Sequence, residues 1–180
     1  MKPAAGIVGP VPPGADPETY DRLRRRVLWS LPYGLYVLGA RAGDRRNGMT
    51  INWVTQVSFD PKLVAVSVER SAYTHELVVE GRAFSLNLLA REDRAMVRKF
   101  TKPVEVDLEA RTLNGYPFHD GRSGAPVLDG AVGHVDCELH RTVEVGGHSL
   151  FIGEVVDAAF AGAEDTPVLR MEDTRMSYGG

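Results

Sequence analysis

The chain has 180 residues, a net charge of −3 and 43% hydrophobic residues, which is typical of one globular domain with one core. The near-neutral charge argues against a nucleic-acid partner, and no apolar run is long enough to predict a membrane partner. The single cysteine, Cys137, excludes an intrachain disulfide and a zinc framework, and it favours a reducing, cytoplasmic setting.

The N-terminal region divides into two parts. Residues 1–15 are dense in proline and glycine, which predicts a flexible arm ahead of a single domain over residues 16–180. Asp16 followed by Pro17 is a helix-start signal, and the apolar spacing that follows predicts a helix to about Trp29.

The rest of the chain predicts a mainly β fold with a few short helices. Alternating or β-branched segments predict strands at residues 33–41, 49–59, 63–69, 83–89, 131–139 and 148–160. Short helices are expected at residues 74–80 and 91–99, and a Gly146-Gly147 turn is expected before the last strand. Residues 102–122 have weak periodicity and are expected to form a long loop. About six strands would then close into a barrel-like sheet with three helices outside.

The most informative stretch is residues 47–61. It opens with the turn signal Asn47-Gly48 and continues as a predicted strand. Thr50, Asn52 and Ser58 share one parity, so on a continuous strand they would lie on one face. Two explanations stay open: an ordinary half-buried strand, or a strand whose polar face meets a ligand rich in hydrogen-bonding groups.

A second polar row alternates along residues 131–140. His134, Asp136, Glu138 and His140 are all possible metal ligands. Neighbours of one parity are roughly 7 Å apart along a strand, so four of them cannot converge on one ion. A solvated outer face is therefore favoured and no metal site is predicted. Neither of the common phosphate-binding glycine motifs is present.

Three blocks of the sequence resemble the flavin reductase-like family. They are residues 48–68, residues 74–89 and residues 147–156, and together they cover roughly residues 33–158 in the family's order. The C-terminal tail departs from the family pattern, because residues 167–173 read Pro-Val-Leu-Arg-Met-Glu-Asp where members often have Leu-Leu-Tyr-Tyr-x-Gly.

The resemblance implies an FMN-binding split β-barrel that works as a homodimer, with FMN (or FAD) near the subunit interface. It implies an NAD(P)H-dependent flavin reductase that uses NADH or NADPH and can supply reduced flavin to a separate monooxygenase. Two alternatives stay open: a non-enzymatic FMN-binding electron carrier, and a barrel that has lost its cofactor and serves as an interaction module.

The resemblance also implies which residues meet the flavin. Residues expected along the ring and ribityl chain are Asn47, Met49, Thr50, Asn52, Trp53, Val54, Thr55 and Ser58. Ser71 and Thr74 would hold the phosphate or simply cap a helix. Asn87 would pair with flavin or with backbone, and Lys99 and Phe100 would close over the cofactor or end a helix in solvent. His148 matches a family histidine, implying a catalytic role near flavin or nicotinamide; otherwise it is a polar residue that starts a strand.

Overall fold

The computed structural model describes residues 9–176. These residues form two compact units. The first unit comprises the described residues among 1–32 and 175–180, and the second comprises residues 33–174. Much of the expected flexible arm, residues 1–8, lies outside the described residues, and so does the C-terminal Tyr-Gly-Gly at 178–180. The expectation of a single domain from residue 16 stays a prediction.

The first unit contains helix α1 (Pro17–Trp29), which confirms the expected helix. The side chain of Asp16 accepts a hydrogen bond of 2.9 Å from the backbone N–H of Thr19, and Pro17 occupies the first turn. The hydroxyl of Ser30 donates to the carbonyl of Arg26 at the other end. No residue of this described helix is buried.

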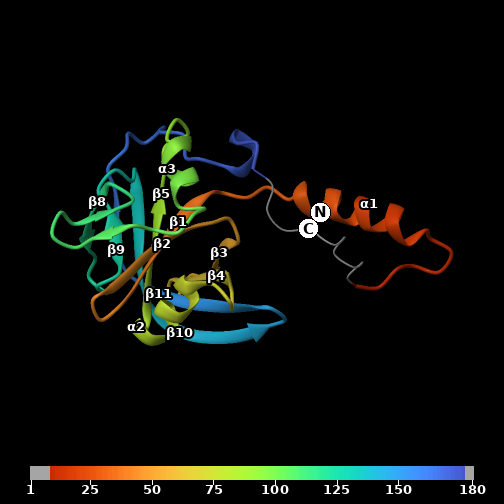
Figure 1. Cartoon of the computed structure of the whole chain (residues 1–180), viewed down its shortest axis with the longest axis horizontal. Coiled ribbons are helices and arrows are strands. Elements are labelled where there is room, and N and C mark those ends of the chain that lie inside the picture. The colour runs from red at the N-terminus through yellow and green to blue at the C-terminus, as the bar shows by residue number, and fades with distance from the viewer. Residues whose placement is uncertain (1–8, 177–180) are drawn as a thin grey trace. The chain divides into compact units, whose positions relative to one another are not determined.

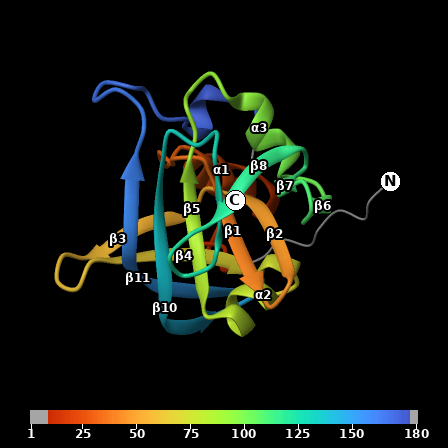
Figure 2. The same ribbon diagram turned by 90° about the vertical axis from the view of Figure 1, so that its left-hand side faces the viewer.

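The second unit is built on one antiparallel sheet of seven strands in the order β2-β1-β5-β10-β11-β4-β3 (Figure 1). The strands are β1 (Tyr36–Ala42), β2 (Arg45–Ile51), β3 (Val54–Ser58), β4 (Leu63–Glu69), β5 (Ala83–Leu88), β10 (Gly133–Val145) and β11 (His148–Phe160). The two strands at the ends of this order are joined by only Asn52 and Trp53. The sheet therefore curls so that its first and last strands are connected through that link (Figure 2).

Short helices and a second small sheet complete this unit. Helix α2 (Tyr73–Gly81) packs against β1 and β2, and helix α3 (Arg94–Lys99) follows β5. A 3-10 turn covers Met171–Asp173. The second sheet holds β6 (Val106–Asp107), β7 (Thr112–Leu113), β8 (Tyr116–Asp120) and β9 (Pro126–Leu128). Across residues 9–176, no helix is long and apolar enough to span a bilayer.

The expected long loop at residues 102–122 is wrong, because three strands of the small sheet lie within it. Two of these strands have only two residues each, which is too short to leave a periodic signal in the sequence. A tight turn inside the segment joins β7 to β8, with φ angles of 52° at Asn114 and 79° at Gly115.

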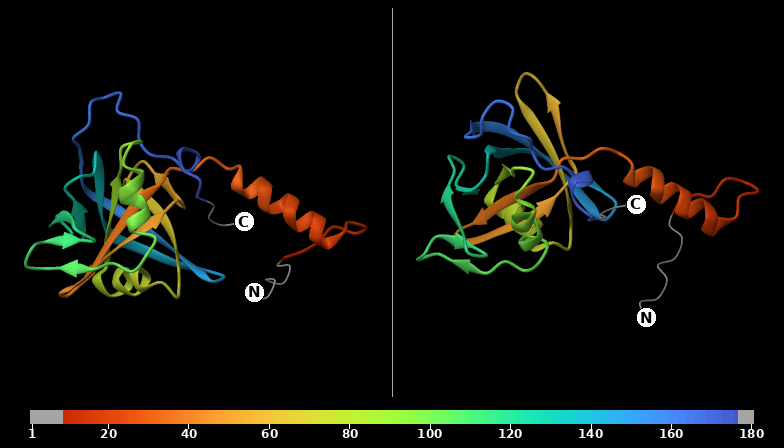
Figure 3. Two further views of the ribbon diagram at one scale, coloured as in Figure 1. Left: turned by 45° about the horizontal axis from the view of Figure 1, so that its top comes forward. Right: turned by 90° about the horizontal axis from the view of Figure 1, so that it is seen from above.

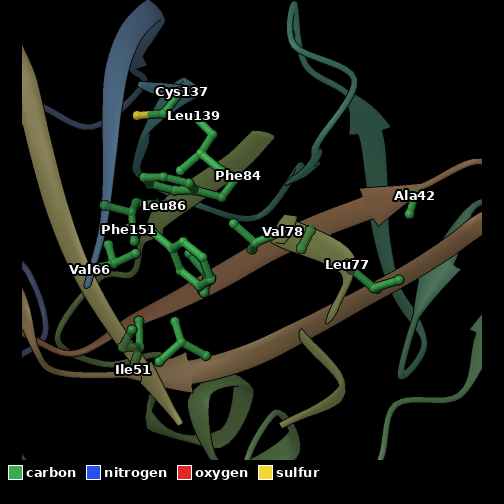
Figure 4. Packing of buried hydrophobic residues seen from close by; sticks show 13 residues of the cluster. Ala42, Ile51, Val66, Leu77, Val78, Phe84, Leu86, Cys137, Leu139 and Phe151 are labelled. Atoms are coloured by element: carbon green, nitrogen blue, oxygen red, sulfur yellow. The ribbon is translucent and has the colours of Figure 1, made fainter. Parts of the chain in front are cut away.

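The hydrophobic core lies between the curled sheet and helix α2 (Figure 4). Phe84 and Phe151 are completely buried at its centre, and Leu77 and Val78 of α2 pack onto the same cluster. Cys137 is also completely buried there and acts as a small core residue. Burial, followed by the charge of Asp136, raises the pKa of the Cys137 thiol to about 12.

The stretch at residues 47–61 differs from the expected single strand. The structure divides it into β2 and β3, and Asn47 and Gly48 lie inside β2, paired with Ala40 and Gly39. The turn falls earlier, at Gly43, whose φ is 58°. Gly48 has a packing role instead, since a Cβ there would stand 2.7 Å from the Phe100 ring.

The polar row on β10 is corrected at Asp136. Glu138 and His140 are exposed as expected, but Asp136 is completely buried, because the segment that holds Gly121 and Ser123 packs against its carboxylate. Its carboxylate accepts hydrogen bonds from the backbone N–H (2.7 Å) and the hydroxyl (2.5 Å) of Ser123. Within the described part of the chain, no group of histidine, cysteine and acidic residues is arranged to hold a metal ion.

Candidate functional site

The link between β2 and β3 contains a buried amide that lacks hydrogen bonds. Asn52 is only 2% exposed, and neither its Nδ2 nor its Oδ1 has a partner among the described residues. A buried polar group without a partner costs about 1–3 kcal/mol. Such a group is expected where a ligand supplies both a donor and an acceptor.

The neighbouring residue, Trp53, contacts the candidate catalytic residue. The rings of Trp53 and His148 lie with centroids 5.1 Å apart and planes inclined by 54°. His148 begins β11 directly after the Gly146-Gly147 turn and is half-buried. The carbonyl of Trp53 accepts a 3.0 Å hydrogen bond from the N–H of Ser67, which fixes the link against β4. The structure thus brings together Asn52, Trp53 and His148.

A second group of predicted residues meets at the start of α2. The Nδ2 group of Asn47 donates a 2.7 Å hydrogen bond to Oγ1 of Thr74, which is 1% exposed. The N-cap position is Ala72, and no described side chain caps the helix. The alternative in which Ser71 or Thr74 caps this helix is therefore wrong. The backbone N–H groups of the first turn, with exposed Ser71 just before them, form an environment that favours a phosphate.

The remaining residues of β2 and β3 have different environments. Met49 packs against the core, and Thr50 donates from its hydroxyl to the carbonyl of Val97 at 2.5 Å, so Thr50 faces α3. In β3, Val54 and Ser58 are half-buried and Thr55 is exposed. The expected continuous strand is interrupted between Thr50 and Ser58, because β2 ends at Ile51 and β3 begins at Val54, so strand alternation no longer relates these residues.

Asn87 does not offer hydrogen bonds to a cofactor. It is completely buried, its Nδ2 group donates to the carbonyl of Val37 (3.1 Å) and the hydroxyl of Ser85 (3.2 Å), and its Oδ1 accepts from the N–H of Leu128 (2.7 Å). The two partners considered for this amide were flavin and backbone, and the structure shows backbone groups together with the Ser85 hydroxyl. Asn87 ties β5 to β1 and β9 and is removed from the candidate flavin contacts.

Phe100 is likewise not a cover over a cofactor. It is 1% exposed, it lies against Gly48, and its ring centroid is 6.0 Å from that of Tyr116. Phe100 therefore packs the end of α3 onto β2. Lys99 is exposed at the end of α3, and its carbonyl accepts from Nδ2 of Asn114, which matches the alternative of a solvated helix end.

One residue beside the site had no predicted role. His75, in the first turn of α2, shares a 2.8 Å hydrogen bond between its Nε2 and the hydroxyl of Ser149, and its ring lies 4.9 Å from that of Phe151. Burial lowers the pKa of His75, and the charge of Arg70 lowers it further. Ser149 follows His148 directly, so His75 holds the start of β11. The sequence showed His75 only as a member of a matched block.

These residues fit a flavin. The free amide of Asn52 matches a ring edge that offers both donors and acceptors, and the indole of Trp53 offers an aromatic wall. The uncapped start of α2, beside Thr74, suits the phosphate. Asn47 and Asn52 lie five positions apart, or about 17 Å at the rise of a strand, which is a suitable length for a ligand with a ring at one end and a phosphate further along.

Comparison with known proteins identifies the family. A flavin reductase like domain model matches residues 28–179. An NADH-dependent FAD reductase of Streptomyces globisporus is 34% identical over 156 residues, which cover 84% of this chain and 82% of that protein. A high molecular weight rubredoxin of Moorella thermoacetica is 36% identical over 136 residues, but this chain spans only 58% of it.

A solved structure agrees with the sequence comparisons. The NADH:FAD oxidoreductase of Streptomyces globisporus superposes with a TM-score of 0.75 at 30% identity, covering 92% of this chain and 96% of that one. The expected mainly β, split-barrel fold is confirmed by this likeness. With its seven-stranded curled sheet and its residues 28–179 matched, the chain belongs to the flavin reductase-like domain family.

Proposed function

We propose that this protein is an NAD(P)H-dependent flavin reductase that binds FMN or FAD and passes hydride from the nicotinamide to the flavin. The observation that carries the proposal is the buried, unpartnered amide of Asn52 beside the Trp53–His148 ring pair. Relatives named as flavin reductases support it, including an NADH-dependent FAD reductase and a flavin reductase of Pseudomonas putida.

The flavin, when bound, supplies the hydride-accepting chemistry, and the protein's residues supply position and electrostatics. Asn52 donates to and accepts from the polar edge of the ring. Trp53 and the half-buried His148 limit the access of water to this end of the site. Thr74, Ser71 and the first N–H groups of α2 hold the phosphate. His148 orients the nicotinamide and needs no proton transfer of its own, because hydride transfer requires none at that atom.

We also propose that the protein is a homodimer in the cytoplasm and hands reduced flavin to a separate monooxygenase. Exposed apolar side chains support a dimer: Phe59 is 84% exposed at the end of β3, and Val145 is 47% exposed in the β10–β11 hairpin. Beyond Glu138, where its pairing with β5 ends, strand β10 of this hairpin pairs with β11 alone (Figure 3). Flavin reductase components of two-component systems occur among the relatives, including that of a tryptophan halogenase.

A titration of the protein with FMN and FAD, followed by flavin fluorescence, tests the proposal. NADH and NADPH are then added anaerobically to each complex. Binding followed by loss of the oxidised-flavin absorbance supports a reductase and identifies the nucleotide. Binding without bleaching by either nucleotide supports the electron-carrier alternative. Absence of binding, with Asn52→Leu behaving like the unmodified protein, contradicts the proposed site.

A further inference from the structure

The first turn of α2 is bonded to two different strands through consecutive side chains. Thr74 accepts a hydrogen bond from Asn47 of β2, at the end of the site proposed for the phosphate. The next residue, His75, shares the 2.8 Å hydrogen bond between its Nε2 and the hydroxyl of Ser149 in β11. Ser149 directly follows His148, at the other end of the site. One helical turn therefore contacts both ends of the proposed site, through separate hydrogen bonds.

The His75 side chain is packed as well as bonded. It is half-buried, and its ring centroid lies 4.9 Å from that of Phe151, which is completely buried in the core (Figure 4). Ser149 is only 2% exposed, so water has little access to its hydroxyl. Because a buried hydroxyl that loses its partner is unfavourable, the bond between His75 and Ser149 resists opening.

The turn that precedes His148 is held from a second direction. The N–H of Arg70, just after β4, donates a 2.9 Å hydrogen bond to the carbonyl of Gly147. The guanidinium of Arg70 donates to the carboxylate of Glu144 at 3.3 Å. These contacts fix where the turn lies. They leave the rotation of the strand start to the side chains that follow the turn.

Strand β11 begins with two side chains on opposite faces. Successive side chains of a strand point to opposite sides, and here Ser149 bonds to His75 while His148 packs against Trp53. A strand start that is bonded on one face resists rotation about its own axis. The imidazole of His148 then keeps its place on the indole, and loss of the bond on the first face should loosen the ring contact on the second.

His75 makes this bond in its neutral form. A neutral imidazole has one donor and one acceptor nitrogen, so Nε2 either donates to the Ser149 hydroxyl or accepts from it. Burial lowers the pKa of His75 and the charge of Arg70 lowers it further, whereas Glu144 acts in the opposite direction. The imidazole is therefore neutral at neutral pH, and its role here requires a hydrogen bond and no charge.

We propose that His75 is a positioning residue for hydride transfer, which acts through Ser149 to hold His148 against Trp53, where His148 orients the nicotinamide. The inference rests on the proposed function. Thr74 has its own bond to Asn47, so the phosphate end of the site does not depend on His75. The effect of His75 therefore falls on the use of NADH and not on the affinity for FMN.

The kinetic test measures the KM for NADH at saturating FMN and the dissociation constant of FMN. His75→Ala and Ser149→Ala are each expected to raise the KM for NADH about fivefold, as the loss of one hydrogen bond implies, with the affinity for FMN unchanged. Combined with His148→Ala, neither replacement should raise the KM further, because no imidazole is left to position. Asn87→Ala, which weakens the fold elsewhere, is the control and should leave the KM unchanged.

A second readout needs no cofactor. The imidazole protons of His148 lie beside the indole of Trp53, whose ring current shifts their NMR resonances. The spectrum of Trp53→Leu shows where these resonances lie without that shift, and the spectrum of His148→Ala identifies them. In His75→Ala and in Ser149→Ala, the resonances of His148 are expected to move toward their positions in Trp53→Leu. Asn87→Ala should leave them in place.

Two results would overturn the inference. One is an increase in KM that adds in full to that of His148→Ala, which would mean that His75 acts on the site by another route. The other is a set of His148 resonances that stays in place in both His75→Ala and Ser149→Ala. If the unmodified protein did not oxidise NADH with flavin, the proposed function would fail instead, and the NMR comparison would still decide whether His75 positions the ring.

Discussion

The imidazole of His148 lies against the indole of Trp53, with ring centroids 5.1 Å apart. This contact joins the start of β11 to the link between β2 and β3. It couples a residue that follows a tight turn to one that is distant in the sequence and that directly follows Asn52, whose buried amide has no partner. Replacing either ring is therefore expected to disturb the other.

A double-mutant cycle of Trp53→Leu and His148→Ala is expected to give a coupling free energy of about 0.5–1.5 kcal/mol in flavin binding. His148→Gln should keep the pH profile of NADH oxidation unchanged, because His148 has a positioning role. A pH profile that loses an ionisation in His148→Gln would show that the imidazole transfers a proton.

Replacement of Asn52 should separate stability from binding. Asn52→Leu removes a buried amide that has no partner, so the free energy of unfolding without flavin should stay the same or rise. Flavin affinity should fall about tenfold, which equals about 1.4 kcal/mol for the lost hydrogen bonds. Thermal unfolding and a fluorescence titration measure the two effects. Lower stability with unchanged affinity would indicate that the amide has protein partners instead.

Asn87 should show the opposite behaviour. Asn87→Ala leaves the carbonyl of Val37 and the N–H of Leu128 without their partner in a completely buried place. The expected loss is about 1–3 kcal/mol in the free energy of unfolding, with flavin affinity unchanged. Urea denaturation and flavin titration of the same sample check both. A selective loss of flavin binding at full stability would return Asn87 to the site.

Gly48 tests the packing of α3 on β2. A methyl group at this position would meet the Phe100 ring at 2.7 Å, so Gly48→Ala is expected to destabilise the fold by about 1–3 kcal/mol. Phe100→Leu, which frees space, should recover part of that loss in the double variant. The measurement is the unfolding midpoint in urea. Equal destabilisation with and without Phe100→Leu would mean that backbone conformation, not the ring, requires glycine.

His75 should make stability depend on pH. Because burial lowers its pKa in the folded protein below the ordinary histidine value, the unfolded chain binds the proton more readily. The contribution of neutral His75 to the free energy of unfolding is fully present at a pH above the ordinary histidine pKa, and it declines as the pH falls below that pKa. His75→Gln should therefore flatten the decline of the unfolding free energy between about pH 7.5 and pH 5.5. His140→Gln, at an exposed position of β10, is the control and should leave the decline unchanged.

The sequence predicted some elements with their full extents, whereas strand β10 covers Gly133–Val145 and not the expected residues 131–139. Helix α1, strand β4 and strand β11 have the expected extents, because capping residues and sustained apolar patterns mark them locally. The small sheet was missed, since three of its four strands have only two or three residues and carry no periodicity. The break at Asn52 was also missed: strand alternation runs through it, and only the placement of β2 and β3 at opposite ends of the sheet order requires a bend.

At the site, the residue types could be predicted but their partners could not. Asn52, Trp53 and His148 are brought together as the resemblance implied, whereas Asn87 and Phe100 belong to the packing of the protein. The sequence does not distinguish a buried asparagine that bonds to a ligand from one that bonds to the backbone. The difference lies in which N–H and carbonyl groups a distant strand, here β9, brings within reach.

The sheet has its first and last strands connected through two residues, and the unpartnered amide is one of them. Strand β2 is held by its pairing with β1, and strand β3 is held by its pairing with β4. A ligand bonded to Asn52 would therefore act on both ends of the sheet order at once, and its binding should slow amide hydrogen exchange in β2 and β3 together.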